Sequence, residues 1–524
     1  MKKILSLMFT LFAFFHLQGG NINWSSPPVV ISGTNINAVN PVLAMDSHGN
    51  AVAAWAENNL IKASSHPFSG SWTSEVIVSA TGASSPSLVM DANGNATLVW
   101  IGASGVIFAS TKTLTGNWST PTSLSNSGAS TPVIGVDGSG DVVAAWARAG
   151  NIETQTKLFG GNWQGRTTIT STAAANPAVA IGGSGTGTRA FVVWQGTSGG
   201  IPVVFASTKL LSGSWASQLV LSNTSNNAIN PKIAVDSNAN AIAVWYEYNI
   251  TGVSYTNVTV QSSGRLAATG AWDNAVALSV PGIRNPSALC ANVAFDGFGN
   301  AVAVWNTSFD DETFTIQSAV QPLNSQWSNP QDIIDSNLYA YSEAIAATNF
   351  GDTLGVYMYY NGANLLLQSV ESNINGYLNN VWSVPLTISA GTDNAYPKMV
   401  ATVNNNTMYS AVVWSHFDGA HTSVVAVTGS KSLLLPPSNL SVVQSSSNFG
   451  VFTVYSNTLS WTASTDPNAA GYLIFRNGLF IDQVGAGVTQ FVDYNRVNNG
   501  SVVYSVTTVD AGQSQSAAVS VSFP

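Results

Sequence analysis

The chain has 524 residues, of which only 8% are charged, and its formal net charge is −9. A chain this poor in lysine and arginine lacks the basic surface that nucleic acids and anionic membranes attract, so neither is expected as a partner. It contains a single cysteine, Cys290, so no disulfide can form within the chain, and we expect this thiol to be buried.

Residues 1–20 have the pattern of a bacterial-type secretory signal. Two lysines precede an apolar run, and small residues follow it. The run is too short to span a membrane comfortably, and no other stretch is apolar enough to do so. We therefore expect a mature chain without a membrane span that is secreted, periplasmic or on the cell surface.

Residues 40–55, NPVLAMDSHGNAVAAW, form a motif that recurs eight times. Two apolar runs flank an Asp-x-x-Gly turn, in which the aspartate can accept a hydrogen bond from the backbone and glycine supplies the left-handed conformation of a hairpin. Runs that are apolar on both faces predict strands that are covered on both sides. The turn aspartates are Asp46, Asp91, Asp137, Asp236 and Asp296, and Gly182, Thr348 and Thr402 replace them in three copies.

Tryptophans mark the rest of each repeat. One follows the aspartate by nine residues in most copies, as Trp55 follows Asp46, and a second stands in a Gly-x-Trp motif before another short strand, as at Trp72. Each unit then has four strands in 45 to 60 residues, which is typical of a β-propeller blade, and the tryptophans are predicted to pack between blades.

The two ends of the repeat region complement each other. Residues 21–33 match the second motif without the first, and the eighth copy has the first motif without the second. We therefore expect the N-terminal strand to close the ring beside residues 422–427, because closure leaves no open sheet edge. This predicts eight blades over residues 21–431, with seven blades as the alternative.

The repeats resemble bacterial secreted propellers that are built of Asp-x-x-Gly-Asn repeats, a resemblance that implies the fold and says little about function. Residues 432–524 resemble a fibronectin type III domain, in which Trp461, Tyr472 and Tyr504 match core positions. This second resemblance implies a β-sandwich that serves as a spacer or adhesion unit. The predicted fold is thus all-β: a signal peptide at 1–20, a propeller at 21–431 and a fibronectin type III domain at 432–524.

The candidate binding site lies on the face opposite the Asp turns, where the loops after each tryptophan should open. These loops are bland in the first four repeats and carry aromatic and acidic residues in the last four. Aromatic rings stack on sugars or peptide side chains, and carboxylates fix hydroxyls or cations. The predicted binding residues are Tyr246, Glu247, Tyr248, Asp310, Asp311, Glu312, Tyr359, Tyr360, His416 and Asp418.

No catalytic constellation emerges from the sequence. The turns differ from the Ser-x-Asp-x-Gly-x-x-Trp motif of sialidases, no spacing selects a pair of carboxylates for glycoside hydrolysis, and few histidines are present to serve as the base of a Ser-His-Asp triad. The Asp137–Asp141 turn has too few oxygens for calcium. We therefore predict a non-enzymatic binding or adhesion scaffold without metal or cofactor, which recognises an extracellular protein or glycan; the alternative is a carbohydrate-active enzyme of glycosidase type on the same face.

Overall fold

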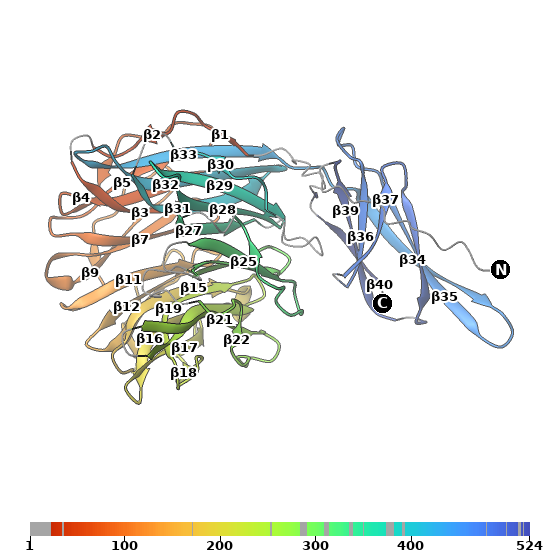
Figure 1. Cartoon of the computed structure of the whole chain (residues 1–524), viewed down its shortest axis with the longest axis horizontal. Helices are drawn as coiled ribbons and strands as arrows, with labels where there is room; N and C mark the ends of the chain where they lie inside the picture. Colours follow the sequence, from red (N-terminus) through yellow and green to blue (C-terminus); the bar gives the residue numbers. More distant parts are fainter. Residues whose placement is uncertain are drawn as a thin grey trace. The chain divides into compact units, whose positions relative to one another are not determined.

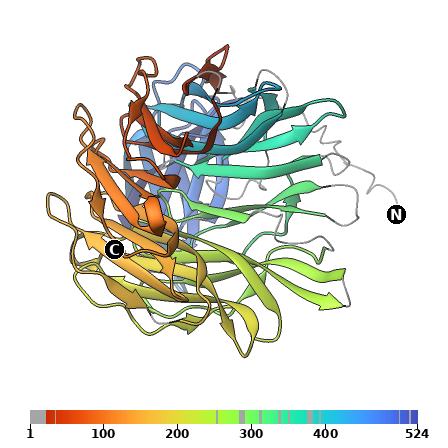
Figure 2. The ribbon, with the colours of Figure 1, turned by 90° about the vertical axis from the view of Figure 1, so that its left-hand side faces the viewer.

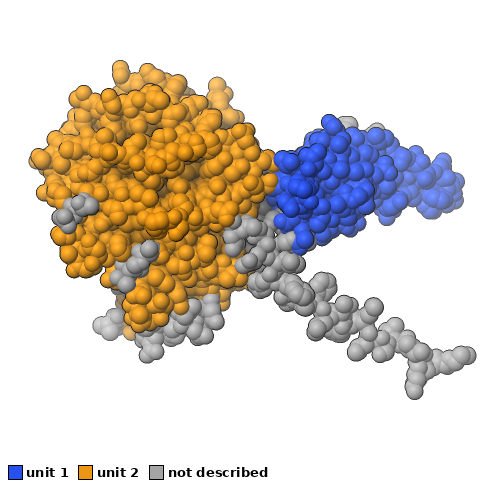
Figure 3. Space-filling model, turned by 90° about the horizontal axis from the view of Figure 1, so that it is seen from above, with its two compact units in different colours: residues 1–21, 434–524 blue, residues 22–433 orange. Residues whose placement is uncertain are grey.

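The computed structural model describes residues 22–523 except 34–35, 170, 252–253, 283–290, 309–313, 335–338, 349–350, 374–381, 390–392, 478, 499, 512–514 and 517. It divides the described chain into two compact units, residues 22–433 and residues 434–523 (Figure 3). Cys290 and the proposed signal segment lie outside the described residues. Among the described residues, no helix is long and apolar enough to cross a membrane.

The larger unit consists of eight antiparallel sheets; in seven of them the strands follow chain order, and the eighth also contains the two N-terminal strands. The first strands are β3 (Ala38–Met45), β7 (Ser84–Met90), β11 (Ala129–Val136), β15 (Ala175–Gly182), β19 (Asn227–Val235), β23 (Ala291–Phe295), β27 (Tyr339–Ala347) and β31 (Asn394–Asn404). The second strands are β4 (Ala51–Glu57), β8 (Ala96–Ile101), β12 (Val142–Arg148), β16 (Arg189–Ser198), β20 (Ala241–Thr251), β24 (Ala301–Thr307), β28 (Asp352–Tyr360) and β32 (Thr407–Phe417). The third strands are β5 (Leu60–His66), β9 (Ile107–Lys112), β13 (Asn151–Lys157), β17 (Ile201–Leu210), β21 (Ser254–Arg265), β25 (Thr315–Gln321), β29 (Leu365–Asn373) and β33 (Thr422–Ser432). The fourth strands are β6 (Val76–Ile77), β10 (Thr122–Ser123), β14 (Thr167–Ile169), β18 (Leu219–Val220), β22 (Val276–Ala277), β26 (Gln331–Asp332) and β30 (Leu386–Thr387).

The eight sheets follow one another around a circle. Each first strand packs against the first strand of the next sheet, from β3 through β7 to β31, and β31 in turn packs against β3. The view in Figure 2 shows the sheets in colour order around a common centre, while Figure 1 shows them side by side along the ring. The larger unit is therefore an all-β, propeller-like ring, with the first strand of every sheet innermost.

The N-terminal residues complete the last sheet. Strands β1 (Asn23–Trp24) and β2 (Val29–Val30) both pair with β33, with Trp24 opposite Gly429. Ser32 Oγ accepts a hydrogen bond from the backbone N–H of Val424 at 2.9 Å. Ser79 Oγ accepts the equivalent bond from the backbone N–H of Ile61 at 2.7 Å in the first sheet. The seam between last and first sheets is filled by an apolar cluster that includes Ala38, Ala53, Trp55, Ala411, Val413 and Val424.

The smaller unit is a pair of sheets. One contains β34 (Ser438–Asn448), β35 (Thr453–Thr462) and β38 (Gln490–Arg496); the other contains β37 (Leu479–Gly485), β36 (Gly471–Arg476), β39 (Val502–Val509) and β40 (Val519–Phe523). Trp461 and Tyr472 meet edge-on in the core, with ring centroids 5.5 Å apart. Tyr504 donates its hydroxyl hydrogen to Asp493 Oδ2 at 2.6 Å, and burial, helped by this carboxylate, raises the pKa of Tyr504 to about 12.

Candidate functional site

The aspartates of the turns between first and second strands hold these turns in place through hydrogen bonds. In the turn at Asp46, Oδ1 accepts the backbone N–H groups of His48 and Asn50, both at 2.8 Å, and Oδ2 accepts the Asn50 amide at 2.7 Å. The turns at Asp91, Asp236 and Asp296 repeat this pattern, and Asp137 repeats its backbone part. Backbone and amide donors therefore occupy these carboxylates, as the hairpin chemistry predicts.

Successive turns also fit against each other. Gly94 has a φ of 85°, and a Cβ at this position would lie 3.0 Å from Asp46 Oδ2 and 2.9 Å from Leu114 Cδ1. Gly140 approaches Asp91 Oδ2 in the same manner, and Gly299 approaches Asp236 Oδ2. Glycine is thus needed in these turns both for its conformation and for its missing side chain.

The opposite end of the innermost strands carries a repeated β-bulge. In six of the first strands a residue directly before proline has a φ of 48° to 55°, and the sheet register shifts at that point. These bulge residues are Asn40, Ser85, Thr131, Asn176, Asn230 and Tyr396. A left-handed conformation is costly for residues other than glycine, and bulges commonly re-aim side chains where a strand meets the surface.

The bulge residues form one level of the ring. Each stands six residues before the turn position of its own repeat, so all six lie at the same height on innermost strands, far from the Asp turns. Four of them are exposed and two are half-buried, while the proline that follows each is buried. One face of the ring therefore presents small polar side chains and one tyrosine at the ends of its innermost strands. Asn176 and Asn230 also make contacts of their own, Asn176 with Gln195.

Three aromatic side chains are exposed at strand ends on this same face in the last two sheets. Tyr396 is 61% exposed, Tyr360 at the end of β28 is 40% exposed, and Phe417 at the end of β32 is 39% exposed. Tyr360 donates its hydroxyl hydrogen to Gly362 O at 2.9 Å, which fixes its ring. Rigid, half-exposed rings beside polar groups are the usual components of a sugar- or peptide-binding surface.

The predicted aromatic site in the fifth sheet requires correction. We expected Tyr246 and Tyr248 in a loop, but β20 continues to Thr251 and includes both. Tyr246 is 1% exposed and donates its hydroxyl hydrogen to Asn306 O at 2.7 Å. Tyr248 is 9% exposed and packs at a tilt against Tyr255, and its burial raises the pKa of its hydroxyl. Neither ring offers a free face to a ligand.

Glu247 is also buried and already has hydrogen-bond partners. Its carboxylate accepts the Asn226 amide at 2.7 Å and the backbone N–H of Asn223 at 3.4 Å. Glu57 stands at the same repeat position and accepts the backbone N–H of Gly33 at 3.3 Å. In both cases the glutamate holds the connection that leads into its own sheet, 24 residues earlier in the chain. This shared geometry assigns Glu247 a structural contact that the sequence analysis did not foresee.

The remaining predicted residues lie in the last sheets. Asp418 is exposed, and its Oδ1 accepts the N–H groups of Ala420 and His421 at 2.8 Å, bonds that lower the pKa of its carboxyl. Tyr359 is half-buried in β28. His416 is half-buried in β32 with Nδ1 3.2 Å from Asn394 Oδ1. Asp310, Asp311 and Glu312 lie outside the described residues.

The described part of the chain contains no group of three or more histidine, cysteine, aspartate or glutamate side chains arranged to hold a metal ion. Glu247 and Asp418, the described carboxylates of the predicted site, both accept hydrogen bonds from the chain itself. The bulge residues and the exposed rings described above offer hydrogen bonding from small polar side chains and stacking on aromatic faces.

The bulge residues could have been recognised in the sequence. Six X-Pro pairs share one spacing to the turn position of their repeats. They are Asn40-Pro41, Ser85-Pro86, Thr131-Pro132, Asn176-Pro177, Asn230-Pro231 and Tyr396-Pro397. A residue before proline is restricted in conformation, so a repeated X-Pro pair within a predicted strand signals an interruption of the ladder.

Comparison with known proteins gives no family. No family model matches the chain, and no curated protein matches its sequence. Among solved structures, a fungal alcohol oxidase of the AA5 family in complex with copper is 12% identical, with a TM-score of 0.45, covering 96% of this chain and 99% of its own. An α-L-arabinofuranosidase from Fusarium graminearum is 9% identical with a TM-score of 0.35, covering 66% and 92%. The six-bladed, fucose-recognising lectin of Aleuria aurantia is 10% identical with a TM-score of 0.31, covering 57% and 96%. These neighbours include both enzymes and a lectin, and at this level of similarity they favour neither reading.

Proposed function

We propose that the chain is an exported, non-enzymatic binding and adhesion scaffold that recognises a glycan or protein on the face of the ring that carries the bulge residues. The observation that carries this proposal is Tyr396, a 61% exposed ring on an innermost strand, at the same level as five small polar bulge residues. A ring of hydrogen-bonding groups with an aromatic wall suits a sugar or an extended peptide.

The proposed architecture is an eight-bladed propeller followed by a fibronectin type III domain. Eight sheets with cyclic packing of their first strands support the blade count over the alternative of seven. The second domain is supported by its three-plus-four sheet arrangement and by Trp461, Tyr472 and Tyr504 in its core. Residues 1–20 would serve as the export signal, and the second domain would act as a spacer.

A screen of the purified mature chain on a glycan array tests the proposal, with pull-down from surrounding cells for protein partners. The informative variant is Tyr396→Ala combined with Tyr360→Ala, both of which remove exposed rings and leave the core intact. Phe68→Ala is the matched control, because Phe68 is a 41% exposed aromatic beside the Asp turns.

The proposal predicts a ligand that the tyrosine variant loses and that Phe68→Ala retains. Equal binding by all three proteins would place the site elsewhere. Hydrolysis of a bound glycan by the wild-type chain would instead favour the carbohydrate-active enzyme, whose carboxylates would then have to include residues beyond Glu247 and Asp418.

A further inference from the structure

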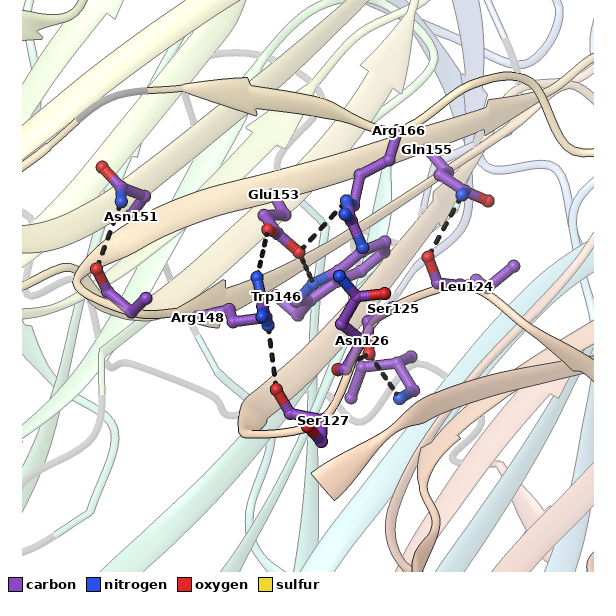
Figure 4. Close-up of polar contacts among 12 residues, drawn as sticks. Leu124, Ser125, Asn126, Ser127, Trp146, Arg148, Asn151, Glu153, Gln155 and Arg166 are labelled. Carbon is purple, nitrogen blue, oxygen red and sulfur yellow. Dashed lines mark hydrogen bonds and ion pairs between the residues drawn. The ribbon is translucent and has the colours of Figure 1, made fainter. Parts of the chain in front are cut away.

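Two clusters of charged residues occupy the same three repeat positions with opposite signs. In the first sheet Lys62 pairs with both Glu57 and Glu75. In the third sheet Glu153 pairs with both Arg148 and Arg166 (Figure 4). The central residue follows the first by five positions and precedes the third by 13 in both clusters. The repeat geometry thus brings one cation to two carboxylates in one sheet, and one carboxylate to two cations in the other.

The arginine cluster is an incompletely neutralised group. Glu153 Oε1 accepts Arg148 Nη1 at 3.1 Å, and Glu153 Oε2 accepts the buried indole N–H of Trp146 at 2.9 Å. Arg166 Nε lies 3.6 Å from the same Oε2, too far for a good hydrogen bond. Two guanidinium groups therefore share one carboxylate, which leaves a net charge of +1 and most of the Arg166 donors unused.

The two arginines are accessible, and hydrogen bonds hold Arg148 in place. The Arg148 and Arg166 side chains are 26% and 30% exposed, while Glu153 is 7% exposed. Arg148 Nε donates to Ser127 O at 2.9 Å in the connection from the preceding sheet, as Figure 4 shows. Arg148 also ends β12 opposite Ala129, two residues before the bulge residue Thr131. The cluster consequently lies on the same face as the proposed binding site.

We propose that Arg148 and Arg166 bind the carboxylate of an acidic sugar, which deepens the proposed function and rests on it. A planar carboxylate matches guanidinium donors and offsets the remaining positive charge. The chain has only 16 lysines and arginines. Asp493 of the smaller unit also pairs with two arginines, Arg476 and Arg496, but in the described part of the larger unit Glu153 is the one carboxylate that does so. The cluster of the first sheet, Lys62 with Glu57 and Glu75, has one more negative than positive charge. It should therefore not bind a carboxylate, and it provides an internal control.

The test is calorimetric titration of the full mature chain with a glucuronate oligosaccharide, a neutral glucose oligosaccharide of equal length and an acidic peptide, at low and at raised salt. Arg166→Gln removes one long ion pair from a half-exposed position, so the variant should fold. Glu75→Gln is the matched change in the first sheet. Thermal unfolding of both variants verifies folding.

We expect the glucuronate oligosaccharide to bind more tightly than its neutral counterpart, with an affinity that falls as salt screens the charges. Arg166→Gln should lower this affinity about tenfold, while Glu75→Gln leaves it unchanged. Equal binding of acidic and neutral sugars, full affinity in Arg166→Gln, or stronger binding of the acidic peptide would each overturn the inference. Neutral-sugar binding that is lost in the variant Tyr396→Ala, Tyr360→Ala and kept in Arg166→Gln would refute this inference and leave the proposed function standing.

Discussion

Replacing Gly94 with alanine should reveal how neighbouring Asp turns lock together. The new Cβ would lie 3.0 Å from Asp46 Oδ2 and 2.9 Å from Leu114 Cδ1. Leu114 is 43% exposed and can move aside, but Asp46 is 2% exposed and held by three hydrogen bonds. The variant must therefore strain or break hydrogen bonds to a charged group, which are worth about 1.5–3 kcal/mol each.

Gly128→Ala separates this contact from backbone strain. Gly128 has a φ of 78°, close to the 85° of Gly94, yet a Cβ there would meet nothing within 4 Å. Left-handed strain alone should cost about 1 kcal/mol in both variants, and the Asp46 contact should bring the total for Gly94→Ala to about 3 kcal/mol.

Urea unfolding followed by tryptophan fluorescence measures both losses, because every tryptophan except Trp461 precedes residue 434. A double-mutant cycle tests the contact directly, by comparing the double variant Asp46→Ala, Gly94→Ala with the single variant Asp46→Ala. With the carboxylate gone, adding Gly94→Ala should cost little more than Gly128→Ala costs in the wild-type chain. Equal losses for Gly94→Ala and Gly128→Ala, or an undiminished loss in the double variant, would refute the contact between turns.

Three further outcomes follow from buried groups. Burial raises the pKa of Asp296 to about 6 from an ordinary value near 3.8, so between these pH values the folded chain holds a proton that the unfolded chain has released. The free energy of unfolding should therefore fall by at most about 3 kcal/mol as the pH rises from 4 to 6. Asp296→Asn should remove this pH-dependent component, which unfolding measured as a function of pH will show. Glu247→Ala should destabilise the ring by about 1–2 kcal/mol, because Asn226 and the Asn223 N–H lose their acceptor, while binding of any array ligand stays the same. Tyr246→Phe should cost about 1 kcal/mol in urea unfolding, also without changing ligand binding, whereas weakened binding would restore Tyr246 to the site.

Local chemistry explains which features the sequence predicted. The Asp turns depend on bonds between residues two and four positions apart, so their spacing reports their structure directly. The tryptophans recur at fixed repeat positions, and Trp55, Trp146 and Trp305 are each fully buried, as packing between sheets requires. The all-β architecture was likewise predictable, because apolar runs and turn residues alternate throughout the repeats.

Non-local contacts explain the errors. Nothing near Tyr246 in the sequence shows that β20 continues as far as Thr251 and pairs with β21 along this length, so that Tyr246 and Tyr248 lie in a buried strand and not in a loop. Glu247 is buried because the connection 24 residues earlier supplies its donors, a relation visible only by comparison with Glu57. The X-Pro pairs of the bulges are visible in six of the eight repeats, but their shared height on one face of the ring depends on the closed arrangement of the sheets.

Hydrogen–deuterium exchange of the full chain with the ligand captured by the array or pull-down tests the central claim most directly. We predict slower exchange on binding in peptides that cover the bulges at 38–42, 84–87 and 394–398, with no change at the Asp turns 46–50, 91–95 and 236–240. Protection of the Asp turns with unaltered bulge peptides would contradict the account and move the binding surface to the other face of the ring.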